Sequence, residues 1–300
     1  MRSEPVRHHY IPQFILRNFQ FDEKHLYYFD KQTGSVLVKE PKEIFMGRNL
    51  YRDEKNYTAD PVKIEKTLAA FEGEVAAIIK ERFLEEREIV LSAEENAKLK
   101  LFFAMMGFRS LRTNRRFGSD ATGQTKAFYR QYQKDGDFLD MWKRNLGYVA
   151  QCRSLEEVLS CLDIDKPIKE FLSRDTEGYF GRYFAVAEAN EGNSFAIGDA
   201  YPVVITGTLP NGVPVEMYDI YPISANRVLF LVCRGVEATP AEVLQLRSFL
   251  FLPPKPIAET NCIKLRAKKL CTDEVQYINK QITDNAEQGF AFKPQQTGEF

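Results

Sequence analysis

The spacing of hydrophobic and polar positions changes twice along the chain. Up to about residue 60, apolar residues come in short runs such as 26–29 and 36–38, which flank the polar turn Lys31–Gly34. Two β-rich runs around a short turn that ends in glycine predict a β-hairpin. Between about residues 60 and 172 the pattern becomes mainly helical, and from Tyr179 short β-rich runs return.

Two helices of the middle region have the clearest patterns. The first is predicted from about Asp60 to Phe83, with an apolar stripe at helical spacing made by Ile64, Leu68, Phe71, Val75 and Ile78. The second contains Leu99–Phe108, which is apolar on nearly every face. Because such a helix has no face suited to water, we expect it in the interior of the fold.

The C-terminal region is predicted as strands followed by one helix. Residues 183–187 and 194–197 flank the polar turn Asn190–Asn193, which predicts a second hairpin. Further strands are predicted at 202–206, 216–222 and 227–232, and a short one at 49–52 in the N-terminal region. A final helix is expected from about Asp273 to Gln288.

This order of elements predicts an α+β fold. We expect a single domain over residues 1–292, with a mostly antiparallel sheet built from the N- and C-terminal segments and packed on a helical middle region. The tail 293–300 carries Pro, Gln and Gly without a core face and is expected to be disordered.

Composition narrows the class of protein. The chain carries 41 basic and 42 acidic side chains, a formal net charge of −1, so no net field favours non-specific binding to nucleic acid or to an anionic membrane. The five cysteines include no C-x-x-C pair, which indicates free thiols, no disulfides and a reducing compartment. With no apolar run long enough to span a bilayer and no signal-peptide pattern at its start, the protein is expected in the cytoplasm, away from membranes.

All three histidines lie within the first 25 residues: His8, His9 and His25. The H-E-x-x-H zinc motif, the phosphate-binding loop and the dinucleotide fingerprint are missing from the sequence. In an extended segment adjacent side chains point opposite ways, so we expect one of His8 and His9 to face solvent. His9 is then either a candidate catalytic group or a packed histidine bonded to backbone.

The segment that follows is predicted to dock on the domain. Ile11, Ile15 and Phe19 share one face of a short helical stretch, whereas Gln13 and Arg17 lie off that face and are candidate binding residues. Arg17 has the geometry to bind a carboxylate or phosphate through two hydrogen bonds, or to form a salt bridge that holds the N-terminus.

Three further polar residues stand at or beside apolar elements. Arg109, Arg112 and Arg116 share a helical stripe, so at least one guanidinium should begin near the core and need an anionic partner, for which Asp199 is a candidate. Asp199 ends a strand, where it forms a turn or supplies a functional carboxylate. Asn279 lies on the apolar face of the last helix and must either bond to a loop's backbone or line a polar pocket.

The run His8–Phe19 resembles the opening signature of the family called domain of unknown function 4238, which typically reads H-Y-V-P-Q-F-Y-L-R-x-F. Residues 26–38 are similar to its following hairpin, Phe108–Arg116 to its arginine motif with Asn114 in place of the usual proline, and Phe195–Val203 to its D-x-P-V strand with Tyr201 inserted. Tyr221–Ser224 and the Asn279 helix match its C-terminal pieces. The resemblance implies that the chain shares the fold of this family, but it implies no particular reaction.

Two functions remain open from the sequence. One is a hydrolase for a phosphorylated small-molecule or nucleic-acid ligand, with His9, Arg112 and Asp199 as catalytic residues and Gln13, Arg17 and Asn279 as binding residues; the placement of the histidines favours it. The other is a non-catalytic binding or regulatory module in which the same residues form a buried structural network. The sequence leaves the cofactor, the metal requirement and the oligomeric state open.

Overall fold

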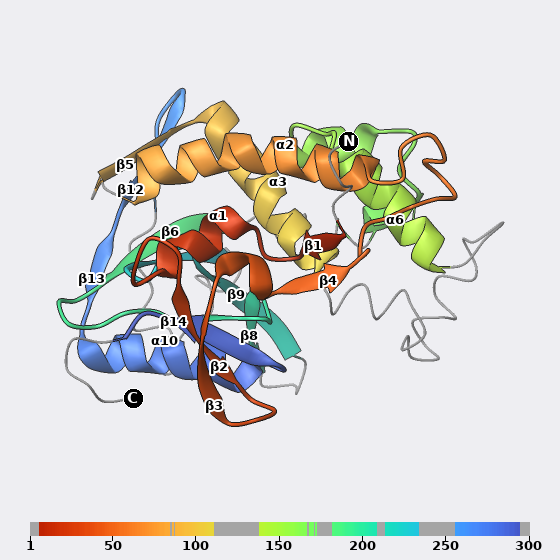
Figure 1. The fold of residues 1–300 in the computed structure, drawn as a ribbon. Coiled ribbons are helices and arrows are strands. Elements are labelled where there is room, and N and C mark those ends of the chain that lie inside the picture. The colour runs from red at the N-terminus through yellow and green to blue at the C-terminus, as the bar shows by residue number, and fades with distance from the viewer. Residues whose placement is uncertain are drawn as a thin grey trace. The chain divides into compact units, whose positions relative to one another are not determined.

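The structure is a computed structural model that describes residues 6–84, 86, 88–110, 138–166, 168–170, 172, 182–208, 214–233 and 256–294. Contacts divide the chain into two compact units. Their helices and strands are labelled in Figure 1. Unit 1 comprises Met1–Ile11, Phe45–Ala77 and Glu94–Glu177; unit 2 comprises Pro12–Ile44, Ile78–Ala93 and Gly178–Phe300. Because each unit is assembled from three separate stretches, no single point in the sequence separates them, in agreement with a single-domain α+β fold.

Unit 1 contains most of the helices of the middle region. Its elements are β1 (Arg7–His9), β4 (Met46–Arg48), α2 (Lys63–Ile78), α3 (Ala93–Arg109), α6 (Phe138–Val149) and α7 (Leu155–Ser160), except that Ile78 of α2 and Ala93 of α3 are assigned to unit 2. Four of the five residues of the predicted stripe, Ile64, Leu68, Phe71 and Val75, are buried on α2. The fifth, Ile78, is only partly buried, because the helix continues as a π-helix from Ile79 and buries that residue instead. The run predicted to be interior is buried at Leu99, Leu101–Met106 and Phe108, as its all-round apolar pattern indicated.

Unit 2 contains three sheets. The five-stranded sheet has the order β13-β6-β10-β9-β8, with β13 (Lys268–Leu270), β6 (Arg182–Ala189), β10 (Arg227–Cys233), β9 (Pro214–Pro222) and β8 (Val203–Thr208). Its only parallel pair among the described residues is β13 with β6. A three-stranded sheet has the order β11-β12-β5, made of β11 (Ile257–Ala258), β12 (Cys262–Arg266) and β5 (Glu88–Ser92).

The third sheet joins the two ends of the chain. Its order is β3-β2-β14-β7, with β3 (Ser35–Lys39), β2 (Leu26–Asp30), β14 (Gly289–Phe292) and β7 (Ile197–Gly198). The first hairpin is therefore confirmed, and its turn contains Gly34 with φ 67°, a conformation that favours glycine. A sheet built from N- and C-terminal segments is likewise confirmed, since β14 lies between β2 and β7.

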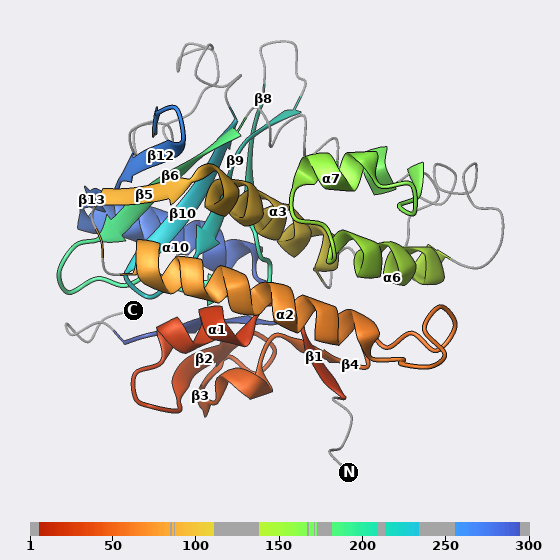
Figure 2. The ribbon, with the colours of Figure 1, turned by 90° about the horizontal axis from the view of Figure 1, so that it is seen from above.

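Helix α10 (Thr272–Asn285) contributes its apolar face to the core of unit 2 (Figure 2). Its apolar side chains Val275, Ile278 and Ile282 belong to one buried cluster with residues of β6, β8, β9, β10 and β14. The same unit holds the short helical elements α1 (Gln13–Leu16), η1 (Arg17–Phe19), η2 (Pro41–Glu43) and η3 (Ile79–Phe83), the last a π-helical continuation of α2.

Three element predictions are wrong. Residues 183–187 and 194–197 do not form a hairpin, because β6 is already flanked by β13 and β10, and β7 pairs with β14 instead. Residues 49–51 form a turn after β4 rather than a strand. The predicted end of the last helix, about Gln288, is wrong: the helix itself is confirmed but ends at Asn285, and Gly289–Phe292 form β14, a strand the sequence pattern did not predict. Of the tail, Lys293 and Pro294 are exposed and the rest lies outside the described residues.

Candidate functional site

The histidine pair lies on β1, which pairs antiparallel with β4 so that His8 is opposite Gly47 and His9 opposite Met46. Both side chains are buried, His8 completely and His9 to 7% exposure. The expectation that one of them faces solvent is wrong, because both faces of this short strand are covered.

His8 has a structural role in unit 1. Its Nδ1 accepts the backbone N–H of Tyr51 at 2.8 Å, and the two rings are stacked with centroids 5.7 Å apart. A nitrogen that accepts an N–H cannot also carry a proton, so the ring is neutral with its hydrogen on Nε2. His8 thereby fixes the turn after β4 and places the Tyr51 hydroxyl.

Arg109, the last residue of α3, is the buried arginine that the helical stripe predicted. Its side chain is 1% exposed and forms an ion pair through Nη1 with Glu72 of α2. Nη2 donates to the backbone oxygen of His9, and Nε donates to the Tyr51 hydroxyl at 3.2 Å. The hydroxyl of Tyr51 in turn donates to the Arg109 backbone oxygen at 3.1 Å.

Charge and burial act together on this cluster. Burial alone would lower the pKa of Arg109, but Tyr51 and the Glu72 carboxylate outweigh it, so the pKa is raised and the guanidinium stays charged. Burial raises the pKa of Tyr51 to about 12, although the charge of Arg109 opposes that rise. The anion that pairs with this buried arginine is Glu72; the sequence had offered Asp199 for that role.

A second carboxylate, Glu65, reaches the same cluster. It lies on α2 seven residues before Glu72, so the two share one face of the helix. Burial raises the pKa of Glu65 to about 7; the charge of Arg109 opposes the rise and that of Glu72 adds to it. Within the described part of the chain, its Oε2 is buried without a hydrogen-bond partner. Sequence reasoning missed Glu65, and its seven-residue spacing from Glu72 beside an apolar stripe is the signal that could have found it.

Asp199 follows β7 in unit 2, and both of its carboxylate oxygens accept backbone N–H groups. Oδ1 accepts from Glu287 at 2.8 Å and Oδ2 from Gln288 at 2.7 Å. Burial raises its pKa, while these two hydrogen bonds act in the opposite direction. Asp199 therefore fixes the turn that connects α10 to β14.

Asn279 also bonds to backbone. Its Oδ1 accepts from the N–H of Ala196 at 2.9 Å, and its Nδ2 donates to the oxygen of Ser194 at 2.8 Å. Of the two roles considered for this amide on an apolar helix face, the bond to a loop's backbone is the one observed. The loop before β7 is thus fastened to α10.

The remaining predicted site residues are placed as follows. Arg17 is exposed and Gln13 is half-buried, whereas Ile11, Ile15 and Phe19 are fully buried and dock the segment as expected. Arg112 lies outside the described residues. His9 belongs to unit 1, and Gln13, Arg17, Asp199 and Asn279 belong to unit 2. The convergence of His9, Arg112 and Asp199 on one point stays a prediction.

A second buried arginine lies in the five-stranded sheet of unit 2. Arg182 at the start of β6 is 2% exposed and pairs with two carboxylates of β9, donating from Nη1 to Asp219 and from Nη2 to Glu216, each at 2.7 Å. Asp219 is 3% exposed, whereas Glu216 is 48% exposed. The sequence pattern gave no indication of this network.

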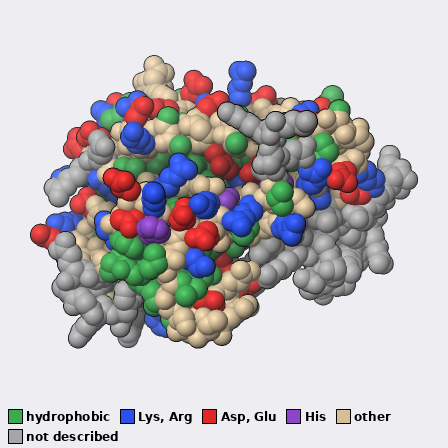
Figure 3. Space-filling model, in the orientation of Figure 1, with side chains coloured by type: hydrophobic (Ala, Val, Ile, Leu, Met, Phe, Trp, Pro, Cys, Tyr) green, Lys and Arg blue, Asp and Glu red, His purple; other side chains and the backbone are tan. Residues whose placement is uncertain are grey.

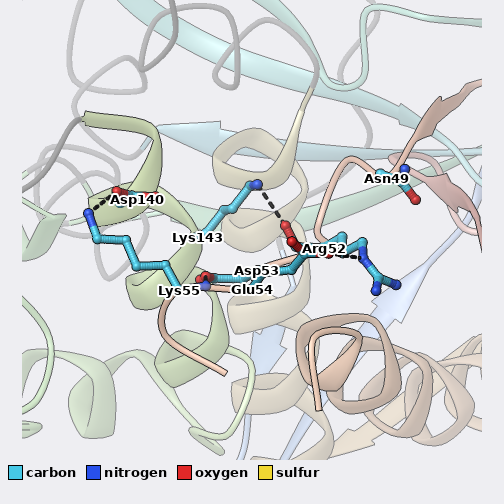
Figure 4. A pocket seen from close by; sticks show the side chains of 7 residues that line it. All are labelled: Asn49, Arg52, Asp53, Glu54, Lys55, Asp140 and Lys143. Atoms are coloured by element: carbon cyan, nitrogen blue, oxygen red, sulfur yellow. Dashed lines mark hydrogen bonds and ion pairs between the residues drawn. The ribbon is translucent and has the colours of Figure 1, made fainter. Parts of the chain in front are cut away.

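A polar cavity of about 300 Å³ opens in unit 1 (Figure 4). It is lined by Asn49, Arg52, Asp53, Glu54, Lys55, Asp140 and Lys143. Lys55 pairs with Asp140, Arg52 with Glu54 at 2.9 Å, and Lys143 donates to the Arg52 backbone oxygen at 2.7 Å. The chain itself thus supplies partners for the cations that line this cavity.

Three features bear on cofactors and environment. In the part of the chain that the structure describes, no group of three or more His, Cys, Asp and Glu side chains is arranged to hold a metal ion. No helix among the described residues is long and apolar enough to cross a membrane. All five cysteines are free thiols.

Comparison with known proteins places the chain in a family. The model of the family described as "Protein of unknown function (DUF4238)" matches residues 7–296, so the chain belongs to this family and the resemblance of its N-terminal signature is confirmed. No curated protein and no solved structure matches the chain. The family description assigns no reaction, so function has to be argued from the residues.

Proposed function

We propose that this member of the family is a non-catalytic binding or regulatory module, in which the polar residues of its signature segments form structural networks. The observation that carries the proposal is the engagement of Asp199, whose two oxygens each accept a backbone N–H of the turn between α10 and β14. A carboxylate used in this way stabilises the fold, and two of its roughly four lone-pair positions are already occupied by N–H groups of the chain itself.

The histidine segment supports the same proposal. His8 is held neutral by the N–H of Tyr51, and the backbone oxygen of His9 accepts from Arg109. Arg109 is in turn neutralised by Glu72. Hydrogen bonds of this kind between His8, Tyr51, Arg109 and Glu72 make the cluster rigid and favour one packing arrangement without any catalytic step. The five free thiols support a reducing compartment, and we propose the cytoplasm as the place where the module acts.

The test compares Asp199→Asn and Asp199→Ala with the wild type. Under the proposal, Asp199→Ala lowers the free energy of unfolding by about 1–3 kcal/mol, because an exposed and a partly buried N–H group lose their charged acceptor. Asp199→Asn keeps one carbonyl acceptor and should cost less. Asp284→Asn on α10, whose carboxylate is 58% exposed, is the matched control and should change stability by less than about 0.5 kcal/mol.

The same proteins are then assayed against phosphomonoesters, phosphodiesters and single- and double-stranded nucleic acids. The proposal expects no turnover by the wild type above the buffer background. Turnover by the wild type that Asp199→Asn abolishes, at a temperature at which both proteins are folded, would overturn it.

A hydrolase is the second candidate, and one observation favours it. Glu65 is a half-buried carboxyl with one buried oxygen, its pKa is raised to about 7 beside a buried arginine, and groups perturbed in this way cluster at functional sites. In this alternative His9, Arg112 and Asp199 act on a phosphorylated or nucleic-acid ligand that Gln13, Arg17 and Asn279 bind. It predicts a rate that depends on a group titrating near pH 7 and that falls in Glu65→Gln but not in Glu74→Gln, whose side chain is 59% exposed on the same helix.

A further inference from the structure

Strand β3 forms one edge of the four-stranded sheet in unit 2. Among the described residues it pairs only with β2, so every second backbone N–H and C=O along its outer side is available to another strand. Edge strands are commonly protected by proline, bulges or central charges, and Ser35–Lys39 has none of these except a lysine at its end. Its Val36 and Val38 are instead 54% and 55% exposed.

The two valines continue an apolar surface of the sheet. Two cross-strand rows lie on one face: Val36, Phe29 and Phe290 in the first, and Val38, Tyr27 and Phe292 in the second. The rings within each row are stacked, with centroids 5.1 Å apart for Phe29 and Phe290. Figure 3 shows hydrophobic side chains gathered over the region of β2, β3 and β14. Each apolar row therefore ends at an exposed valine on the open edge.

We propose that the outer edge of β3 binds the β3 strand of a second copy of this chain, antiparallel and centred on Leu37. In this register all five residues of the strand find partners: Val36 lies opposite Val38 of the copy, Leu37 opposite Leu37, and Ser35 opposite Lys39. Because directly opposite residues share a face, the four valines form one apolar patch that joins the aromatic rows of both sheets. The result is an isologous two-fold interface.

Charge complementarity selects the same register. Lys39, Ser35 and Asp30 project from the face opposite the valines, and Asp30 is the cross-strand neighbour of Ser35. Pairing Lys39 of one copy with Ser35 of the other places the lysine in the same row as the Asp30 carboxylate, with only the small serine between them. The two-fold axis forms this lysine–aspartate approach twice and sets no like charges opposite each other. The inference does not depend on the proposed function, since a dimer of this kind is compatible with a binding module or with an enzyme.

Sedimentation velocity over a series of protein concentrations tests whether the edge mediates self-association. The wild type should show a dimer that increases with concentration, and the double variant Val36→Lys/Val38→Lys should remain monomeric because charges at an edge prevent pairing. Val90→Lys is the matched control: Val90 is 45% exposed on β5, at the edge of the three-stranded sheet. It should dimerise as the wild type does.

Disulfide trapping tests the register. Across an antiparallel pair the Cα atoms lie about 4.5–5.5 Å apart, within the range that a disulfide spans, so Leu37→Cys should cross-link to itself under mild oxidation. The two copies of residue 35 are offset by four residues, about 13 Å along the strands, so Ser35→Cys should not cross-link beyond the background of the wild type and its five free thiols.

Each result decides the proposal. A wild type that is monomeric at every concentration, a Val36→Lys/Val38→Lys variant that still dimerises, or equal cross-linking by Leu37→Cys and Ser35→Cys would each overturn it. Far-UV circular dichroism of every variant checks that loss of the dimer is not loss of the fold. Turnover assays on the monomeric variant report separately on the proposed function.

Discussion

Both units bury arginine side chains, and Arg109 of unit 1 and Arg182 of unit 2 are neutralised differently. Unit 2 also buries Arg227, which pairs with Glu188 at 3.4 Å. In unit 2, Arg182 donates to two carboxylates, of which Asp219 is buried and Glu216 is half-exposed. In unit 1, Arg109 donates to one carboxylate, Glu72, while a second one, Glu65, lies in the same cluster without a hydrogen bond to it among the described residues.

The two clusters differ in the surroundings of their second carboxylate, Glu216 in unit 2 and Glu65 in unit 1. Glu216 is half-exposed, so water can solvate one of the two carboxylates that face Arg182. Glu65 has little access to water, and its pKa rises to about 7 because burial disfavours its charged form. Glu65 of unit 1 therefore holds a proton close to neutral pH, whereas Arg182 of unit 2 is neutralised by a buried ion pair with Asp219.

The largest expected effect is on the buried pair of unit 2. Asp219→Ala leaves the Arg182 guanidinium buried with only the half-exposed Glu216, and should lower the free energy of unfolding by about 3–5 kcal/mol. Glu72→Ala in unit 1 should cost less, about 1–3 kcal/mol, because Glu65 can ionise and balance Arg109 in its place. Urea unfolding at about pH 8 measures both values.

Glu216→Ala is the control for the first pair of variants. Its carboxylate is 48% exposed, so its removal should cost no more than about 1 kcal/mol. If Glu72→Ala proved as costly as Asp219→Ala, Glu65 would not be a reserve anion and the contrast between the two units would be wrong.

The next effect is the pH dependence that Glu65 gives to unit 1. The carboxyl of Glu65 holds its proton up to about pH 7 in the folded protein, compared with its usual pKa of 4.5. Between these values the folded state binds more protons than the unfolded chain, so this group's stabilisation is fully present below about pH 4.5 and is lost as the pH rises through about 7. At about 1.4 kcal/mol per pKa unit, the loss is at most about 3 kcal/mol.

Glu65→Gln removes this titration and should be more stable than the wild type at about pH 8 while matching it near pH 4.5. Denaturant unfolding at several pH values gives the two curves. Glu74→Gln, on the same helix with a 59% exposed side chain, should follow the wild-type curve. Parallel curves for wild type and Glu65→Gln would show that Glu65 does not retain its proton in the folded state.

The helices of unit 1 were predictable because their stabilising contacts follow a local period. Ile64, Leu68, Phe71 and Val75 recur at helical spacing, and each is buried on α2. The same logic placed Asn279 on the core face of α10, where an amide needs partners, and the loop backbone supplies them. Local spacing thus predicted the helices, and it also predicted that Asn279, a polar residue on an apolar helix face, needs hydrogen-bond partners.

Pairings between distant segments were not predictable in this way. The strand at Gly289–Phe292 is defined by its neighbours β2 and β7, which lie far away in sequence, and its four residues carry no signal of their own. Glu65 resembles a solvated residue on a helix flank until Arg109 and Tyr51 are brought beside it by the fold. The partner of Arg109 was unpredictable for the same reason. Several carboxylates in the sequence could have paired with it, and only the tertiary structure selects Glu72.

The smallest expected effect separates helix stability from charge in unit 1. Gly73 lies on α2 between Glu72 and Glu74, is exposed, and an added Cβ would meet nothing within 4 Å. Gly73→Ala should therefore raise the free energy of unfolding by about 0.5–1 kcal/mol through helix propensity, equally at all pH values. Gly289→Ala is the contrast in unit 2, where a Cβ would lie 2.2 Å from the Phe29 oxygen, so the same change should destabilise. A pH-dependent gain in Gly73→Ala would mean that the Glu65 cluster responds to the packing of α2 as well as to its own proton.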